Sequence, residues 1–286
     1  MHIFMDGRNY RKAVELHSHG VQDKDIHEKL SRYRQSGVLF LRDGGDALGV
    51  SARAAQLAPE YEITYRTPLF AIHRNGHYGS IVGHGFDNWK EYHDLVKTVK
   101  RQGGDFIKIM ISGIMDFSGD GSVSEDPLSE NDIQEMIRIA HEEGFAVMIH
   151  ANGARTIEAA ALAGADSIEH GNFVDEACLK VMAEQGTIWV PTYVTITNLI
   201  GCGRFDDTVL EKLRYRQGQM IRRGFELGVK IAAGSDAGAY CVMHGQGIHD
   251  EYVQMRQITE GLFSEQELYA RLADAEEAVK QRFVAK

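Results

Sequence analysis

One pattern of hydrophobic and polar positions recurs along the chain: a helical stretch that ends at glycine, a short apolar run, and then polar residues or glycine. It occurs in "SRYRQSGVLFLRDGG", "VKRQGGDFIKIMISG", "HEEGFAVMIHANG", "AALAGADSIEHGN", "MAEQGTIWVPT" and "FELGVKIAAGSDAG". Glycine after a helix supplies the left-handed cap, and apolar runs of about 4 to 6 residues suit strands that are buried on both faces. The pattern therefore predicts β-strands that alternate with α-helices.

The number of such strands predicts a fold class. With the opening "MHIF" and the segment "EITYRTPLFA" added, the chain has eight predicted strands. Alternating strands and helices form a parallel sheet, and eight of them favour a closed (β/α)8 TIM-type barrel. A doubly wound open sheet is the main alternative, but no GxGxxG follows an early strand. The tail "SEQELYARLADAEEAVKQRF" predicts one extra C-terminal helix, which Ser264 caps.

Composition narrows the setting of the protein. Hydrophobic residues make up 43% of the 286 residues, and only four prolines and no low-complexity linker interrupt them, so we expect one domain over 1–286. A net charge of −10 argues against a nucleic-acid or membrane partner. Three cysteines without a CxxC motif suit a reducing compartment. No apolar run approaches the roughly 20 residues of a membrane span. We expect a cytoplasmic protein with a small-molecule substrate, and self-association stays open.

Polar residues at the ends of the predicted strands are the candidates for chemistry, because barrel active sites lie at the carboxyl ends of the strands. The first strand carries His2, the fourth Lys108, the fifth His150 and the sixth His170, and the eighth leads into Asp236. A single histidine at a strand end is more often a hydrogen-bonded structural residue. Two at equivalent ends of consecutive strands favour a shared role. Imidazoles and a carboxylate that converge are the ligands of a hydrolytic zinc-type site.

Lys108 is unusual because it lies inside the apolar run "FIKIMISG", where a charged ammonium is costly to desolvate. Two chemistries explain such a lysine: a neutral amine that forms a Schiff base, or a lysine that is carboxylated by CO2 and bridges two metals. Asp236, in "GSDAG", has two interpretations as well. It caps the following helix, or it binds metal and takes a proton from water.

The ordered segments "FIKIM", "VMIHANG", "DSIEHGN", "WVPT" and "AAGSDAG" resemble the amidohydrolase superfamily, and most of all its prolidase-like and imidazolonepropionase-like metal-dependent hydrolases. The resemblance extends from "FLRDGG" to "GSDAG". It implies that a first-strand HxH pair and the aspartate after strand eight bind one metal. A carboxylated lysine on strand four bridges to a second metal, which the histidines ending strands five and six hold. These implied roles fall on His2, Lys108, His150, His170 and Asp236.

Two features depart from that family pattern. Many relatives flank the barrel with a β-sandwich built from both termini, and neither terminus here has enough residues for one. We therefore expect the barrel to lack most or all of that domain. The second departure is the HxH pair, of which only His2 is present. If Met1 takes the middle position, the first histidine lies immediately upstream, and we expect the active protein to begin several residues earlier.

Further strand-end residues are candidates for substrate contact. The segment "AIHRNGHYG" offers His73, Arg74 and His77 on a glycine-rich loop, which could equally be a mobile surface loop. Arg74 would pair with a substrate carboxylate. Tyr193, which follows "WVPT", would donate a hydrogen bond to a polarised carbonyl oxygen.

The residues and the resemblance together predict metal-dependent hydrolysis of an amide or peptide-like C–N bond, in a dipeptide or an N-acyl amino acid. Two divalent cations, zinc before others, would lower the pKa of a water to near neutral. Asp236 would accept its proton and deliver it to the leaving nitrogen. Two rivals remain: a lyase of the class I aldolase kind that uses Lys108 as a Schiff base, and a catalytically impaired relative with a binding role.

Overall fold

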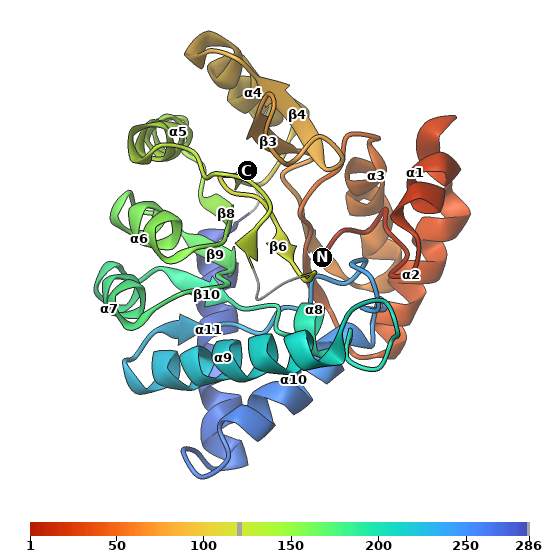
Figure 1. Ribbon diagram of the computed structural model, residues 1–286. Helices are drawn as coiled ribbons and strands as arrows, with labels where there is room; N and C mark the ends of the chain where they lie inside the picture. The colour runs from red at the N-terminus through yellow and green to blue at the C-terminus, as the bar shows by residue number, and fades with distance from the viewer. Residues whose placement is uncertain (119–121, 285–286) are drawn as a thin grey trace.

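The computed structural model describes residues 1–118 and 122–284, and its centre is a parallel sheet surrounded by helices (Figure 1). Seven strands run in the order β11-β10-β9-β8-β5-β3-β4, and every neighbouring pair is parallel. These strands are β3 (Ala71–Arg74), β4 (Gly83–Phe86), β5 (Ile107–Met110), β8 (Val147–Ala151), β9 (Ser167–His170), β10 (Ile188–Val190) and β11 (Lys230–Ile231). A separate parallel pair comprises β1 (Phe40–Arg42) and β2 (Thr64–Arg66), and a short antiparallel pair comprises β6 (Met115–Asp116) and β7 (Ser122–Val123).

Helices alternate with the strands and lie outside them, which confirms the predicted α/β class and is consistent with a TIM-like barrel (Figure 1). The helices are α1 (Tyr10–Ser18), α2 (Asp23–Gln35), α3 (Val50–Leu57), α4 (Trp89–Gln102), α5 (Glu130–Glu142), α6 (Ala154–Leu162), α7 (Glu176–Gln185), α8 (Val194–Thr197), α9 (Asp207–Glu226), α10 (Gly247–Ile258) and α11 (Glu265–Arg282), with a 3-10 turn at Ala58–Tyr61. Among the helices of the described ranges, none is both long and apolar enough to cross a membrane.

The glycines that end the helices act as the sequence predicts. Gly103 after α4 and Gly186 after α7 take φ angles of 77° and 67°, in the left-handed region that favours glycine. Each donates its N–H back to carbonyls of the last helical turn and reverses the chain toward the next strand. The strands that follow, β5 and β10, are buried at every position. Burial on both faces explains why their sequences are continuous apolar runs rather than alternating ones.

The predicted first strand is not formed. Residues 3 and 4 form a turn instead, and a few backbone bonds tie the opening segment to its neighbours on each side. His2 N donates to Ala237 O at 2.9 Å, and Gly44 N donates to Met1 O at 2.8 Å. The Met1 amine also donates to Arg42 O at 3.4 Å. These bonds hold the opening segment between the end of β1 and the turn after β11, but the segment does not form a strand. Figure 1 shows the N-terminus near the middle of the ring of elements.

The predicted strand "EITYRTPLFA" is divided into β2 and β3. Pro68 has no N–H to give to a ladder, and Leu69 has a φ of 68°, so the chain bends between the two parts. The bend is held by Asp105, whose N donates to Thr67 O at 2.8 Å while its carboxylate accepts from Thr67 N at 2.8 Å. As a result β2 pairs with β1, whereas β3 pairs with β5 and β4.

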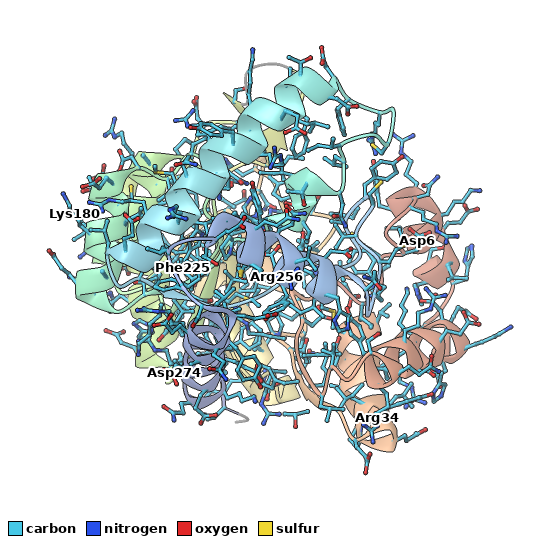
Figure 2. The ribbon with its side chains drawn as sticks, turned by 90° about the horizontal axis from the view of Figure 1, so that it is seen from below. Asp6, Arg34, Lys180, Phe225, Arg256 and Asp274 are labelled. Carbon is cyan, nitrogen blue, oxygen red and sulfur yellow. The ribbon has the colours of Figure 1, made fainter. Side chains whose placement is uncertain are left out.

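The predicted C-terminal helix is α11, and its Ser264 cap is confirmed, because Ser264 and Glu267 form a reciprocal capping box. Figure 2 shows α11, marked by Asp274, next to α10, marked by Arg256. Beyond the helix, Phe283 is fully buried, with its ring 5.2 Å from that of Phe106 and 4.3 Å from the Arg42 guanidinium. The last helix therefore packs onto the strands through an aromatic side chain that covers a buried cation.

Candidate functional site

All five residues that the sequence predicts as metal ligands line one cavity of about 1070 Å³. They come from five places in the fold: the opening turn, the middle of β5, the ends of β8 and β9, and the segment after β11. Parallel strands that end at the same edge bring residues together which are far apart in the sequence. The residues are His2, Lys108, His150, His170 and Asp236.

His150 and His170 lie side by side, with ring centres 4.8 Å apart. Because β8 and β9 are parallel and Ala151 lies opposite His170, the two rings meet at the carboxyl ends of these strands. His150 Nε2 donates to Gly113 O at 3.0 Å, which leaves Nδ1 as the nitrogen with a free lone pair. Burial, and then the charge of Lys108, lowers the pKa of His150 to about 3. Burial also puts the pKa of His170 well below its usual value, so both imidazoles are neutral near pH 7.

His2 and Asp236 form a second pair, with 4.0 Å between His2 Nε2 and Asp236 Oδ1. His2 Nδ1 donates to Gly45 O at 3.0 Å, so Nε2 carries the lone pair on the side of the carboxylate. Burial lowers the pKa of His2 against the opposing effect of Asp236. The ring fits only because residue 44 is glycine, since a Cβ there would overlap the imidazole.

Lys108 is only 3% exposed, and its surroundings lower the pKa of its amine to about 8. Burial is the main cause, and the charges of Glu169 and Asp236 partly oppose it. Glu169 is itself paired with Arg42 at 2.8 Å. With a pKa near 8, roughly a tenth of the amine is neutral at pH 7. Lys108 is thus a buried amine with an appreciable neutral fraction near pH 7.

Backbone strain gathers at the same strand ends. His170, Thr192 and Asp236 have φ angles of 68°, 48° and 53°, in the left-handed region that residues with a Cβ seldom adopt. The Thr192 hydroxyl lies 2.7 Å from His170 Nδ1, so two of the strained residues are hydrogen-bonded to each other. Strained residues of this kind cluster at active sites, where the surrounding structure holds a side chain in a set direction.

Two asparagines, which the sequence analysis did not single out, tie the histidine-bearing segments together. Asn152 and Asn172 each follow a histidine by two residues, and Asn172 Nδ2 donates to Asn152 Oδ1 at 2.8 Å. Asn152 Nδ2 in turn donates at 2.9 Å to Gly113 O, the same carbonyl that orients His150. The sequence signal was present as the repeated H-x-N in "IHAN" and "EHGN". This asparagine bridge fixes the spacing of the three strand ends.

Tyr78 is a further residue that sequence reasoning missed. It lines the cavity, and its ring centre lies 5.4 Å from that of His150. Its backbone N donates to both oxygens of Glu125, at 2.9 and 3.1 Å, which anchors the loop that carries it. Burial, and then the charge of Asp236, raises the pKa of the Tyr78 hydroxyl, so it stays protonated as a hydrogen-bond donor.

Comparison with known proteins identifies the family. The model described as "Amidohydrolase family" matches residues 54–278, well over half of the chain. The chain belongs to the amidohydrolase family. The predicted resemblance is therefore confirmed, and the prolidase-like branch fits this amidohydrolase.

Relatives of this amidohydrolase include an uncharacterized protein of Mycobacterium tuberculosis, 31% identical over 183 residues, which are 61% of this chain and 47% of that protein. Ochratoxinase of Aspergillus niger is 28% identical over 155 residues, which are 52% of this chain and 32% of the enzyme. The chain thus spans about half or less of the curated relatives it matches.

Solved structures share the fold. The structure of A. niger ochratoxinase aligns with a TM-score of 0.75 and 19% identity, covering 97% of this chain and 70% of the other. A Xaa-Pro dipeptidase with bound methionine aligns with a TM-score of 0.67 and 24% identity, covering 83% of this chain and 64% of the other.

The four residues predicted to contact substrate do not line the cavity of this amidohydrolase. Tyr193 is buried, and its hydroxyl donates to Arg214 O at 2.6 Å. Arg74 pairs with Asp132 at 3.4 Å, and His77 lies 3.6 Å from Glu125. His73 is buried, and its Nδ1 donates to Arg74 O at 3.0 Å. Contact of these four residues with substrate stays a prediction, and the cavity lining does not support it.

The candidate metal donors form two pairs, His2 with Asp236 and His150 with His170, and Lys108 lines the same cavity. Within residues 1–118 and 122–284, no three side chains of His, Cys, Asp and Glu lie close enough to hold an ion by themselves. The two pairs supply neutral imidazole nitrogens and a carboxylate, which are donors that zinc prefers. The charge of Lys108 affects the pKa of both His150 and His170.

The asparagine bridge gives a first prediction. Asn152→Ala should lower the affinity for zinc about 10- to 100-fold, because the partners that orient a ligating histidine are lost. It should also lower the free energy of unfolding by about 1–3 kcal/mol, because buried polar groups lose their partners. Asn198→Ala is the matched control: Asn198 Nδ2 also makes two hydrogen bonds, to Cys241 O and Asp250 Oδ2, but outside the cavity. Equal zinc affinity in both variants, measured by competition with a chelating dye, would contradict the orienting role.

Proposed function

We propose that this chain is a metal-dependent amidohydrolase that cleaves an amide or peptide-like C–N bond. The observation that carries the proposal is the meeting of two imidazole-containing donor pairs and the buried Lys108 amine at one cavity. The structural neighbours include a prolidase, an ochratoxinase and a bottromycin amidohydrolase, which supports hydrolysis of this kind. We propose dipeptides or N-acyl amino acids as the substrate class.

His2 and Asp236 would hold one cation and His150 and His170 a second, with zinc favoured by the donor chemistry. Lys108 would join the two after its neutral amine adds CO2, a step that forms an N–C bond and releases one proton. The lowered pKa of Lys108 supports this step, because only the neutral amine attacks CO2. When bound, the cations would lower the pKa of a water to near neutral and polarise the substrate carbonyl.

The protein's own residues then have separate tasks. Asp236 would accept a proton from the attacking water and deliver it to the leaving nitrogen, which makes it both general base and general acid. Tyr78 would donate a hydrogen bond to the oxyanion, the role that the sequence analysis gave to Tyr193. His150 and His170 would hold the second cation, with Gly113 O and the Thr192 hydroxyl fixing the orientation of their rings.

The fold assists by closing around these groups. We propose that the strands form a closed (β/α)8 barrel, with the opening turn filling the gap between β1 and β11. The bonds from His2 N to Ala237 O and from Gly44 N to Met1 O support this closure. It would bring the His2–Asp236 pair opposite the His150–His170 pair.

A test of the function begins with metal content, measured by inductively coupled plasma mass spectrometry on the purified protein. Dipeptides and N-acyl amino acids are then screened for hydrolysis before and after chelation, and after addition of zinc with bicarbonate. We expect activity that chelation removes and that zinc with bicarbonate restores. Hydrolysis that persists in fully chelated protein would contradict the proposal.

A Schiff-base lyase is the second candidate, and the lowered pKa of Lys108 is the observation that favours it. Borohydride treatment in the presence of an aldehyde or ketone substrate separates the two. A covalent adduct on Lys108, found by peptide mass spectrometry, would support the lyase.

A further inference from the structure

The cavity has a second group of lining residues, which we call the rim platform: Phe117, Arg204, Phe205 and Tyr240. Phe117 directly follows β6, Arg204 and Phe205 lie between α8 and α9, and Tyr240 lies between β11 and α10. The Arg204 guanidinium carbon is 4.6 Å from the centre of the Tyr240 ring and 5.2 Å from that of Phe205. The Phe205 ring is 5.2 Å from the Phe117 ring. Three separate segments therefore build one stacked surface.

The rim platform adjoins the candidate metal ligands. Tyr240 follows Asp236 by four residues, and Gly238 and Ala239 between them line the same cavity. A substrate that reaches Asp236 with its scissile bond can therefore extend along this segment onto the stacked rings. Both groups of residues line one and the same cavity.

The chemistry of the rim platform favours an anion that carries a flat apolar group. Arg204 is exposed, whereas the three aromatic rings are half-buried, so a cation and ring surfaces both face the cavity. A guanidinium stacked on rings keeps its planar donors in the plane, where they bind a carboxylate through two parallel hydrogen bonds. The rings offer apolar area for a second aromatic group in an offset or edge-on contact.

A carboxylate near the rim platform, that of Asp116, does not remove the preference of the platform for an anion. Asp116 also lines the cavity, and its Oδ1 accepts from Ser118 N at 2.8 Å and from Ser118 Oγ at 2.6 Å. Those bonds lower the pKa of Asp116, so it is negative and repels a substrate carboxylate from its side. Repulsion by Asp116 and attraction by Arg204 together select the orientation in which the carboxylate meets the guanidinium. Arg8, Arg42 and Lys108 also line the cavity. Arg42 is paired with Glu169 and Lys108 is placed with the candidate metal ligands, so Arg8 is the cation that the test below distinguishes.

We propose that the rim platform is a subsite for the free α-carboxylate and the aromatic side chain of the amino acid released by hydrolysis. The preferred substrates are then N-acyl aromatic amino acids, with the carboxylate on Arg204 and the ring against Phe117 and Phe205. The proposal rests on the proposed hydrolytic function, which it deepens by naming the part of the substrate that is recognised.

The experiment compares N-acetylphenylalanine with its carboxamide, N-acetylphenylalaninamide, in the wild type and in Arg204→Gln. We expect Arg204→Gln to raise KM for the carboxylate about 10- to 100-fold, since a hydrogen-bonded charge pair is lost, and to leave kcat nearly unchanged. KM for the carboxamide should not change. The matched control is Arg216→Gln, because Arg216 is also exposed and stacks 5.3 Å from the Phe173 ring, but outside the cavity.

Binding of the product phenylalanine, measured by calorimetry, tests the subsite independently of the hydrolytic reaction. If neither substrate is cleaved but phenylalanine binds the wild type and not Arg204→Gln, the subsite stands and the hydrolytic function fails. If both substrates are cleaved alike and Arg204→Gln behaves like Arg216→Gln, the function stands and the subsite is overturned. A loss of phenylalanine binding in Arg8→Gln, with none in Arg204→Gln, also overturns the assignment to Arg204.

Discussion

Lys108→Met should lose most of its hydrolytic activity, about 100- to 1,000-fold in kcat, while the protein stays folded. Under the proposed function Lys108 would join two cations, so its loss would remove several kcal/mol of charge stabilisation in the transition state, and each ~1.4 kcal/mol is tenfold in rate. Methionine matches the unbranched shape of lysine and avoids desolvating a charge, so the 3% exposed site accepts it. The Arg42–Glu169 pair remains intact, which leaves no uncompensated charge on the strands nearby. Metal content should fall from two ions toward one.

The pH dependence of activation follows from the same amine. Its pKa of about 8 means that the neutral form, which reacts with CO2, increases as the pH rises toward and past 8. At a constant concentration of dissolved CO2, reactivation of chelated protein by zinc should therefore be faster at pH 8.5 than at about pH 6.5. The rate in Lys108→Met should not depend on bicarbonate at either pH.

Lys29→Met is the matched control for removing a buried lysine. Lys29 is 5% exposed and pairs with Asp25 in α2, away from the cavity lining. This variant should lose stability, because Asp25 loses a partner, but should keep its metal and its kcat. Full metal content and normal turnover in Lys108→Met would mean that the lysine serves only the packing of β5. Activity lost together with a Schiff-base adduct in the wild type would instead favour the lyase.

Asp236→Asn should reduce kcat about 100- to 10,000-fold, the range that a positioned general acid–base contributes. Asparagine keeps the shape of the side chain, and it tolerates the left-handed backbone that Asp236 adopts with a φ of 53°. The loss therefore reports on proton transfer rather than on strain. For an aryl ester, whose leaving group needs no proton, the reduction in kcat should be much smaller than for an amide.

The comparison of an amide with an aryl ester in Asp236→Asn is the decisive measurement, with kcat determined for both. Asp250→Asn provides a control, since Asp250 accepts hydrogen bonds from Asn198 and Gln246 outside the cavity. Equal losses for amide and ester would assign Asp236 to metal binding alone.

The sequence predicted the elements better than the loops between them. Gly103 and Gly186 mark helix ends because a left-handed cap has a clear residue preference, and Lys108 was visible because a charge inside an apolar run has few explanations. The division at Pro68 was also readable in principle, since proline cannot donate to a ladder. The strand predicted for the opening "MHIF" was wrong, because strand formation depends on partners that lie far away in the sequence.

Tyr78 shows why the cavity lining was harder to predict. It follows His77 directly, yet it packs on His150 while His77 faces Glu125. The difference arises from the loop path, which the bonds from Tyr78 N to Glu125 fix across 47 residues. Periodicity carries no information about such a path. Tyr193, by contrast, looked suitable because it follows a strand end, but its hydroxyl faces Arg214 O.

The left-handed backbone at His170, Thr192 and Asp236 limits how this site can change by single substitutions. At such positions most side chains add a steric penalty of about 1–2 kcal/mol before any chemistry is considered, whereas glycine, asparagine and aspartate escape most of it. New specificities are therefore more accessible through residues such as Phe205 and Tyr240, whose backbone is not constrained in this way. Substitutions that change specificity are therefore expected in the surrounding loops rather than at the three positions with left-handed backbone.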